Sequence, residues 1–340
     1  MGTFFKDRFT VIIILFLISV SVFPYTELIT EMLIFGLLAV SFNLMFGYTG
    51  LLSFGHAALF SIGAYTMGLL LVRFEVNIFL GMLAGSILTA MIAMIIGWVS
   101  IRLSGVYFAM LTLAFNEVVY FSILQWKNVT GGDDGLRGIF RPNMDLGLFS
   151  LSLQRPREFF FFVLFFFILS ILAIRRIICS PFGSVLLAIR ENENRTESIG
   201  YNPRDYKIVV FMISGFFAGL AGSLFSIQIK YAALSFCHWS QSGEVLIMAL
   251  VGGTGSLYGP ILGAVLVTLM RSVFSVVWDR WLLLLGMVFV GFIMFLRGGV
   301  WEGLESGFSY LARHFKRKKI SREIALDQSK EVSHGFGDNS

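Results

Sequence analysis

Two glycine-rich stretches interrupt a sequence that is otherwise dominated by apolar residues. Residues 47–56 read GYTGLLSFGH, and residues 252–260 read GGTGSLYGP. Glycine in such numbers destabilises a regular helix, because it loses more backbone entropy on folding than any other residue. At membrane depth, irregular backbone is tolerated only where protein or a water-filled cavity surrounds it. We therefore expect both stretches to lie inside the protein rather than against lipid.

The rest of the chain is too apolar for a water-soluble domain. Of its 340 residues, 56% are hydrophobic and 14% are charged, and the mean hydropathy is +0.81. Soluble domains carry about 45–50% apolar and about 25% charged residues. The apolar excess has to face lipid. This composition excludes a disordered chain, a disulfide scaffold and an ordinary cytosolic enzyme, and no metal site is expected at the two cysteines, Cys179 and Cys237.

Apolar runs divide the chain into membrane spans, each of which needs roughly 20 apolar residues. We predict an all-α integral membrane protein with about ten transmembrane helices, some of them broken by glycine, over residues 9–300. Several of the runs are shorter than a full span. The runs cover Phe9–Phe23, Leu28–Phe46, Ala57–Val72, Ile78–Val99, Gly105–Leu124, Phe159–Ile174, Ile208–Ile227, Val245–Leu257, Ile261–Val277 and Leu282–Leu296.

The basic residues predict that both termini are cytoplasmic, because cytoplasmic loops are enriched in Lys and Arg. Residues 1–8 and the polar tail 313–340 both carry such residues. Counting ten crossings from a cytoplasmic N-terminus places residues 179–207 in the cytoplasm and residues 125–157 in an extracytoplasmic loop. That loop contradicts the rule, since it holds five basic residues, but moving it inside would send the more basic segment before residue 207 outside. The net charge of +5 follows from this topology, and no nucleic-acid partner is expected.

The two glycine-rich stretches fall one in each half of the chain. Interrupted helices in corresponding positions of two halves point to a transport pathway. The residues that we expect to form the breaks are Gly47, Gly50, Gly252, Gly253 and Gly255.

The cytoplasmic segment 179–207 contains a predicted short helix. Pro181 fits the first turn of a helix, and Gly200 is a suitable residue to end it. Val185, Ala188 and Ile189 form a small apolar patch beside alternating charges. One hypothesis is a helix that docks in a groove of a cytoplasmic partner. The alternative is a solvated loop helix.

Polar residues inside the apolar runs are candidates for a translocation path. These are Asn43, Ser53, His56, Asn116 and Glu117. A charge near mid-membrane costs about 2.5–3.5 kcal/mol on insertion scales, so Glu117 should face the bundle interior. The alternative for each is a structural hydrogen bond between helices. Arg271 lies near the middle of another span and needs a partner that the sequence does not name.

Several motifs together resemble the LivM-like permeases of branched-chain amino acid ABC importers. They cover roughly residues 30–300 in the family's order, which makes them specific for the family but not for the substrate. Thr196, Ser198 and Thr254 depart from the usual pattern. The motifs are GYTGLLSFGHA at 47–57, LSGVYFA at 103–109, TGG at 130–132, AIRENE at 188–193, AGLAG at 218–222 and GGTGS at 252–256.

The resemblance implies a multi-pass permease of a bacterial or archaeal cytoplasmic (inner) membrane. In such an importer the permease pairs with a sister permease of the LivH type, two ATPase subunits and a solute-binding protein. The chain would then be no enzyme and bind no cofactor, and the partner subunits would use ATP. The sequence agrees, because it contains no G-x-x-x-x-G-K-[ST] phosphate loop. The residues implied to couple to the ATPases are Arg190, Glu191, Asn192, Glu193 and Gly200.

Other functions are compatible with parts of the sequence. A urea or short-amide permease of the same family would look alike, because the binding protein sets most of the substrate choice. An ion-coupled secondary transporter would suit Glu117 and the two broken helices. An intramembrane enzyme would need catalytic side chains within reach of each other, and the chain has only four histidines.

Overall fold

The computed structural model describes residues 26–141, 143–145, 150–277, 280–295 and 299–302. Within these ranges, seven helices are long and apolar enough to cross a membrane. The expected first span and both expected cytoplasmic termini, residues 1–8 and 313–340, lie outside the described residues. The count of about ten spans and the cytoplasmic location of both ends therefore stay predictions.

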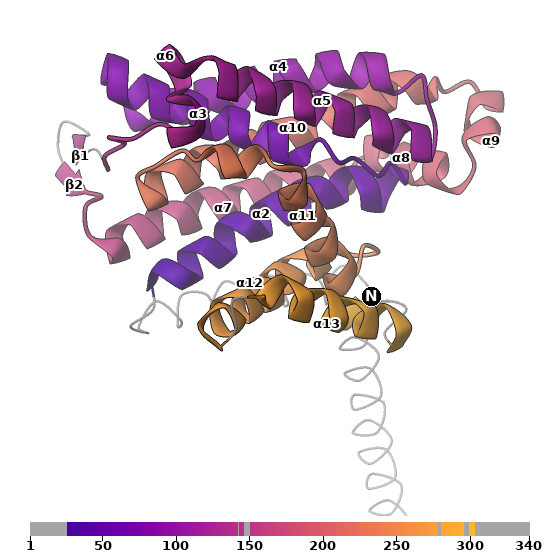
Figure 1. Ribbon diagram of the computed structural model, residues 1–340. Coiled ribbons are helices and arrows are strands. Elements are labelled where there is room, and N and C mark those ends of the chain that lie inside the picture. Colours follow the sequence, from indigo (N-terminus) through magenta and orange to yellow (C-terminus); the bar gives the residue numbers. More distant parts are fainter. Residues whose placement is uncertain (1–25, 142, 146–149, 278–279, 296–298, 303–340) are drawn as a thin grey trace, which may run out of the picture.

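The long helices form a bundle around α10 (Figure 1). Helix α10 packs against α2, α3 and α4, while α7 and α12 pack against α2. The apolar runs predicted these helices, but several begin or end a few residues beyond the predicted limits. Their bounds are α2 (Thr26–Thr49), α3 (His56–Phe74), α4 (Ile78–Ser100), α5 (Val106–Gln125), α7 (Pro156–Ile178), α10 (Pro203–Ile229) and α12 (Gly259–Val277).

Short elements mark the two ends of this bundle (Figure 1). The hairpin end carries the antiparallel strands β1 (Asn143–Asp145) and β2 (Ser150–Ser152), with α6 (Lys127–Thr130) and η1 (Gly132–Asp134) nearby. The opposite end, called the α8 end below, carries α8 (Pro181–Glu191) and α9 (Glu193–Ser198).

The predicted helix from Pro181 toward Gly200 is interrupted. At Asn192 the backbone becomes extended, and its side-chain oxygen accepts a hydrogen bond from the amide of Arg195, so this residue ends α8 and caps α9. Asparagine favours such positions because its short side chain bonds the first free amides of a helix. Gly200 follows α9 with φ of +97°, a left-handed conformation that suits glycine after a helix.

Two further helices are shorter than a full span. Helix α11 (Trp239–Gly252) has 14 residues and α13 (Trp281–Phe295) has 15. Fourteen residues rise about 21 Å, against about 30 Å of hydrocarbon. A short 3-10 helix, η2 (Leu234–Cys237), precedes α11. The expected span Val245–Leu257 is therefore placed too late in the sequence: its helix begins at Trp239 and ends at Gly252.

Three of the five basic residues of segment 125–157 bond other groups of the protein. Arg141 is buried and donates to the carbonyl of Gln228, at the end of α10, over 2.8 Å. Burial lowers the pKa of the Arg141 guanidinium from its ordinary value, and the carboxylate of Glu27 opposes that shift. Arg137 and Arg155 each form a salt bridge with an acidic residue three positions away. These contacts explain how the segment carries positive charge that the topology rule disfavours.

Helices α3 and α10 approach each other at glycines. A Cβ added at Gly63 would overlap the backbone of Gly219, and one added at Gly222 would overlap the carbonyl of Phe60. Small residues at helix contacts in membranes permit this close packing. The glycine positions therefore fix the distance between the central helix and the helix that follows the first break.

We predict that Gly222→Ala destabilises the protein by about 1–3 kcal/mol, because the two backbones have to move apart. Gly243→Ala is the matched control: it lies on α11 with open space around its Cβ position, and alanine favours a helix over glycine. Thermal unfolding of the detergent-purified variants measures the difference. Equal melting temperatures for Gly222→Ala and the unmodified protein would contradict the close approach.

Candidate functional site

The first break, residues 50–55, is held by side chains from two other helices. Thr112 on α5 accepts a hydrogen bond from the amide of Phe54 through its Oγ1, at 3.1 Å. Ser242 on α11 donates to the carbonyl of Phe54 at 2.7 Å and accepts from the amide of Ala57 at 2.9 Å. These side chains therefore supply hydrogen-bond partners for backbone groups of the break, which lipid could not supply.

Asn116 continues this pattern one turn further along α5. Its Oδ1 accepts from the amide of Ala58 at 2.8 Å, and its Nδ2 donates to the carbonyl of Cys237 at 2.8 Å. The first amides of any helix lack partners within that helix. Asn116 thus caps α3 and ties it to the chain that leads into α11.

The second break packs against the α8 end of α2, just before the first break begins. Asn43 donates to the carbonyl of Ser256 at 3.0 Å, and a Cβ at Gly47 would collide with the carbonyl of Thr254. The sequence predicted two breaks but gave no sign that the second lies against the helix that precedes the first. The side chain of Asn43 and the carbonyl of Thr254 together leave no room for a Cβ at position 47.

The irregular backbone begins slightly later than predicted in both breaks. Gly47 lies in the last turn of α2, and Gly252 is the last residue of α11. The chain leaves the helical conformation at Gly50, which has φ of +75°, and at Gly253, which has φ of +106°. Gly255 lies within the second break.

His56 begins α3 and is completely buried. Its Nε2 lies 2.9 Å from the Oγ of Ser214, and Ser214 donates to the carbonyl of Ser41 at 2.6 Å. Because a hydroxyl has a single hydrogen, Ser214 must accept from His56, so Nε2 of the imidazole carries a proton. Ser53, also buried, accepts from the amide of Gly55 at 3.1 Å.

The structure separates Glu117 from the other predicted path residues. Asn43, Ser53, His56 and Asn116 are buried and hydrogen-bonded inside the chain. Glu117 is only partly buried and borders an open pocket. In this conformation, Glu117 is therefore the predicted path residue that a solute can reach.

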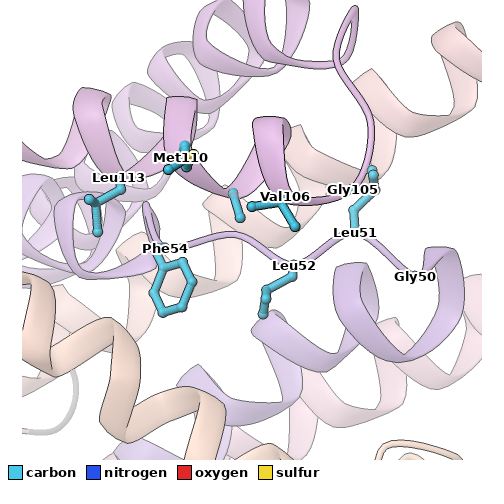
Figure 2. Close-up of a pocket in the computed structure, with 9 residues that line it drawn as sticks. Gly50, Leu51, Leu52, Phe54, Gly105, Val106, Met110 and Leu113 are labelled. Atoms are coloured by element: carbon cyan, nitrogen blue, oxygen red, sulfur yellow. The ribbon is translucent and has the colours of Figure 1, made fainter.

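Two neighbouring pockets form a groove along α5, called the α5 groove below. The first, with a volume of about 410 Å³, is apolar and lies between the first break and the start of α5 (Figure 2). The second has a volume of about 550 Å³. Phe54 and Leu113 line both pockets, which makes the groove continuous. The other lining residues are Gly50, Leu51, Leu52, Gly105, Val106, Ala109 and Met110 in the first pocket and Glu117, Tyr120, His238 and Trp239 in the second.

Arg190 connects the α8 end to the first break. Its guanidinium donates to the carbonyl of Gly47 in the last turn of α2. A cation is favourable there, because the last carbonyls of a helix carry partial negative charge. Of the residues implied to couple to ATPases, Arg190 contacts the helix turn that leads into the first break.

The neighbouring residues fix the segment that carries Arg190. Glu193 forms a salt bridge of 2.6 Å with the buried Lys207 on α10. Glu191 and Asn192 are exposed. Segment 179–207 is thus joined to the bundle at α2 and at α10.

The apolar patch predicted for this segment is not exposed, because Val185 and Ala188 are partly buried. Ile189 is buried against the bundle, so it is not available for docking. The exposed apolar side chains are Leu187, Ile199 and Tyr201 instead.

Arg271 has two acidic partners that the sequence does not reveal. Its guanidinium binds the carboxylates of Glu31 on α2 and Glu244 on α11, the latter at 3.2 Å, and lies over the ring of Phe35. The only signal was a charge inside or beside an apolar run. Sequence spacing could not pair residues 240 positions apart. In the part of the chain that the structure describes, no group of three His, Cys, Asp or Glu residues is arranged to hold a metal ion.

Comparison with known proteins agrees with the resemblance seen in the motifs. The family described as the permease component of branched-chain amino acid transport systems matches residues 25–296. No solved structure matches this chain.

Three relatives illustrate the range of similarity. The chain is 29% identical over 269 residues to the high-affinity branched-chain amino acid transport system permease protein LivM of Escherichia coli, covering 72% of this chain and 62% of that protein. It is 28% identical over 291 residues to the probable LivM of Methanocaldococcus jannaschii, covering 74% and 82%. Identity to the autoinducer 2 import system permease LsrC of Photorhabdus laumondii is 24% over 178 residues, covering 45% and 46%. The chain therefore spans less than two thirds of the Escherichia coli relative.

We predict that Ser242→Ala destabilises the protein by about 1–3 kcal/mol, because it leaves a buried amide and a carbonyl of the first break unpaired. The control is Ser122→Ala, which removes an exposed hydroxyl that bonds only within α5. Thermal unfolding in detergent should show a lower melting temperature for Ser242→Ala alone. If both variants have the melting temperature of the parent protein, the hydrogen bonds from α11 do not stabilise the break.

Proposed function

The chain belongs to the family of permease components of branched-chain amino acid transport systems, and we propose that it is one permease half of an ABC importer for branched-chain amino acids. Its seven apolar helices and its family make it a multi-pass membrane protein. We place it in the cytoplasmic membrane of a bacterium or archaeon. The α8 end then faces the cytoplasm, and the hairpin end faces outward.

The contact between Arg190 and Gly47 carries this proposal. It joins segment 179–207, which would receive the motion of an ATPase, to the helix that leads into the first break. The salt bridge from Glu193 to Lys207 holds the same segment to α10. A shift of the segment would therefore move α2 and α10 as a rigid body, which is a common form of switching.

The α5 groove is the part of the translocation path that this chain contributes. Its wall includes Leu51, Leu52 and Phe54 of the first break, so movement of α2 changes the shape of the groove. A sister permease would close its open side. Access would then alternate between the two faces of the membrane as the ATPases close and open.

The partners follow from the same arrangement. Two ATPase subunits would bind at the α8 end, where Leu187, Ile199 and Tyr201 offer exposed apolar groups. A solute-binding protein would deliver substrate at the hairpin end. ATP would be hydrolysed by the partner subunits. The family and its relatives do not favour a urea or short-amide permease or an ion-coupled transporter.

The test is purification of the tagged chain from its host in mild detergent, with mass spectrometry of what accompanies it. We expect a second permease and ATPase subunits, and ATP-dependent leucine uptake once the complex and its binding protein are reconstituted in vesicles. A chain that purifies alone and transports without ATP would overturn the proposal and favour an ion-coupled carrier.

We predict that Arg190→Ala lowers ATP-dependent uptake at least about tenfold, because a charge-assisted hydrogen bond worth about 1.5–3 kcal/mol is lost at the junction. ATP hydrolysis by the reconstituted complex should continue, since the ATPase sites are elsewhere. Arg102→Ala is the control, because Arg102 is exposed after α4 and lies over Trp98 rather than at a break. Uptake by Arg190→Ala at the parent rate would disprove the assigned role.

A further inference from the structure

Glu117 lies in the interior of α5, and it differs from Glu31 and Glu244, which also lie beyond the first turn of their helices. Glu31 and Glu244 share Arg271 as their cation. In the described ranges, Glu117 forms no ion pair with a basic side chain. A charge at membrane depth costs about 2.5–3.5 kcal/mol, which a cationic partner would offset. The described residues supply none, which leaves this carboxylate available to a cationic ligand.

The pocket around Glu117 has the walls that a cation needs. Tyr120 and His238 stand edge to face with ring centroids 6.1 Å apart, and His238 lies 5.6 Å from the ring of Trp239. Aromatic faces attract ammonium groups within about 6 Å, and the effect is larger where water is excluded. The aromatic wall and the carboxylate are therefore suited to the same kind of ligand.

Asn116 fixes this wall in place. Its bond to the carbonyl of Cys237 holds the residue just before His238 against α5. His238 itself lies 2.8 Å from the Oγ of Ser240, within the first turn of α11. The pocket is thus built from side chains whose positions are set before a ligand arrives, which lowers the entropic cost of binding.

An apolar compartment adjoins the charged one. The first pocket of the α5 groove is lined by aliphatic side chains such as Leu51, Val106 and Met110, and it shares Leu113 with the pocket of Glu117. A molecule with an ammonium group beside a branched aliphatic chain would fill both compartments.

We propose that Glu117 binds the ammonium group of the transported amino acid, with Tyr120, His238 and Trp239 around that group and the aliphatic side chain in the first pocket. That the ligand is the transported amino acid rests on the proposed function. That the groove recognises an aliphatic amine rests only on the residues that line it. Asn116 acts as a positioning residue, because it holds the aromatic wall without touching the ligand.

The experiment measures binding of two leucine-like probes to the purified importer complex without its binding protein, by saturation-transfer NMR. Isoamylamine has the ammonium group and the branched chain, and isocaproate has the chain with a carboxylate instead. We expect isoamylamine to bind and isocaproate to bind at least about tenfold more weakly. Glu117→Gln should weaken isoamylamine at least about tenfold, in line with loss of a charge-assisted bond. Glu117→Asp should restore part of the affinity.

The matched control is Glu75→Gln, which removes an exposed carboxylate after α3 and should leave both affinities unchanged. Equal binding of the two probes, no binding of isoamylamine, or an unchanged affinity in Glu117→Gln would each overturn the site. Leucine uptake by the reconstituted complex separates this outcome from the proposed function. An importer that carries leucine normally with Glu117→Gln refutes the site alone. A complex that binds isoamylamine but carries no leucine refutes the proposed substrate alone.

Discussion

The hydrogen bonds of the first break are the constraint on which the rest of the structure depends. Backbone groups at membrane depth have no water to bond, so every helix that ends there needs partners from elsewhere in the protein. Thr112 and Asn116 on α5 and Ser242 on α11 supply those partners. Helices α3, α5 and α11 are consequently joined at one point, and the groove along α5 is a consequence of how they meet.

Charged side chains in the bundle likewise find partners of opposite charge or partial charge within the protein. Arg190 lies at the end of α2, where the helix carbonyls are partly negative, and Arg271 lies between two carboxylates. Arg141 bonds carbonyls at the end of α10. Glu117 is an exception to this pattern: its carboxylate borders an open groove, and none of the described residues pairs with it as a cation. Exceptions to local consistency are expected at functional sites.

The sequence predicted those features that depend on local chemistry. Apolar run length gave the long helices, and glycine content gave both breaks, because each property acts within a few residues. It did not predict that Asn43 bonds Ser256 or that Arg271 has two partners, because these contacts join residues far apart in the chain. The sequence also predicted one helix from Pro181 toward Gly200, whereas Asn192 divides this segment into α8 and α9. The division was not predicted because the capping of α9 depends on a single side-chain hydrogen bond. The coupling role that the family resemblance implies for segment 179–207 stays a prediction, and the apolar patch alone could not show that Ile189 faces the bundle.

The end of α2 at the first break explains why Arg190 can bind at this place. In a continuous helix the carbonyl of Gly47 would accept the amide of residue 51. Because the chain leaves the helix at Gly50, that amide is no longer in place, and the guanidinium of Arg190 donates to the carbonyl of Gly47. The residues that follow immediately, Leu51 and Leu52, line the α5 groove. One glycine-rich stretch thus provides both the attachment point for segment 179–207 and part of the wall of the α5 groove. A displacement at the α8 end therefore reaches the groove through only a few residues of backbone.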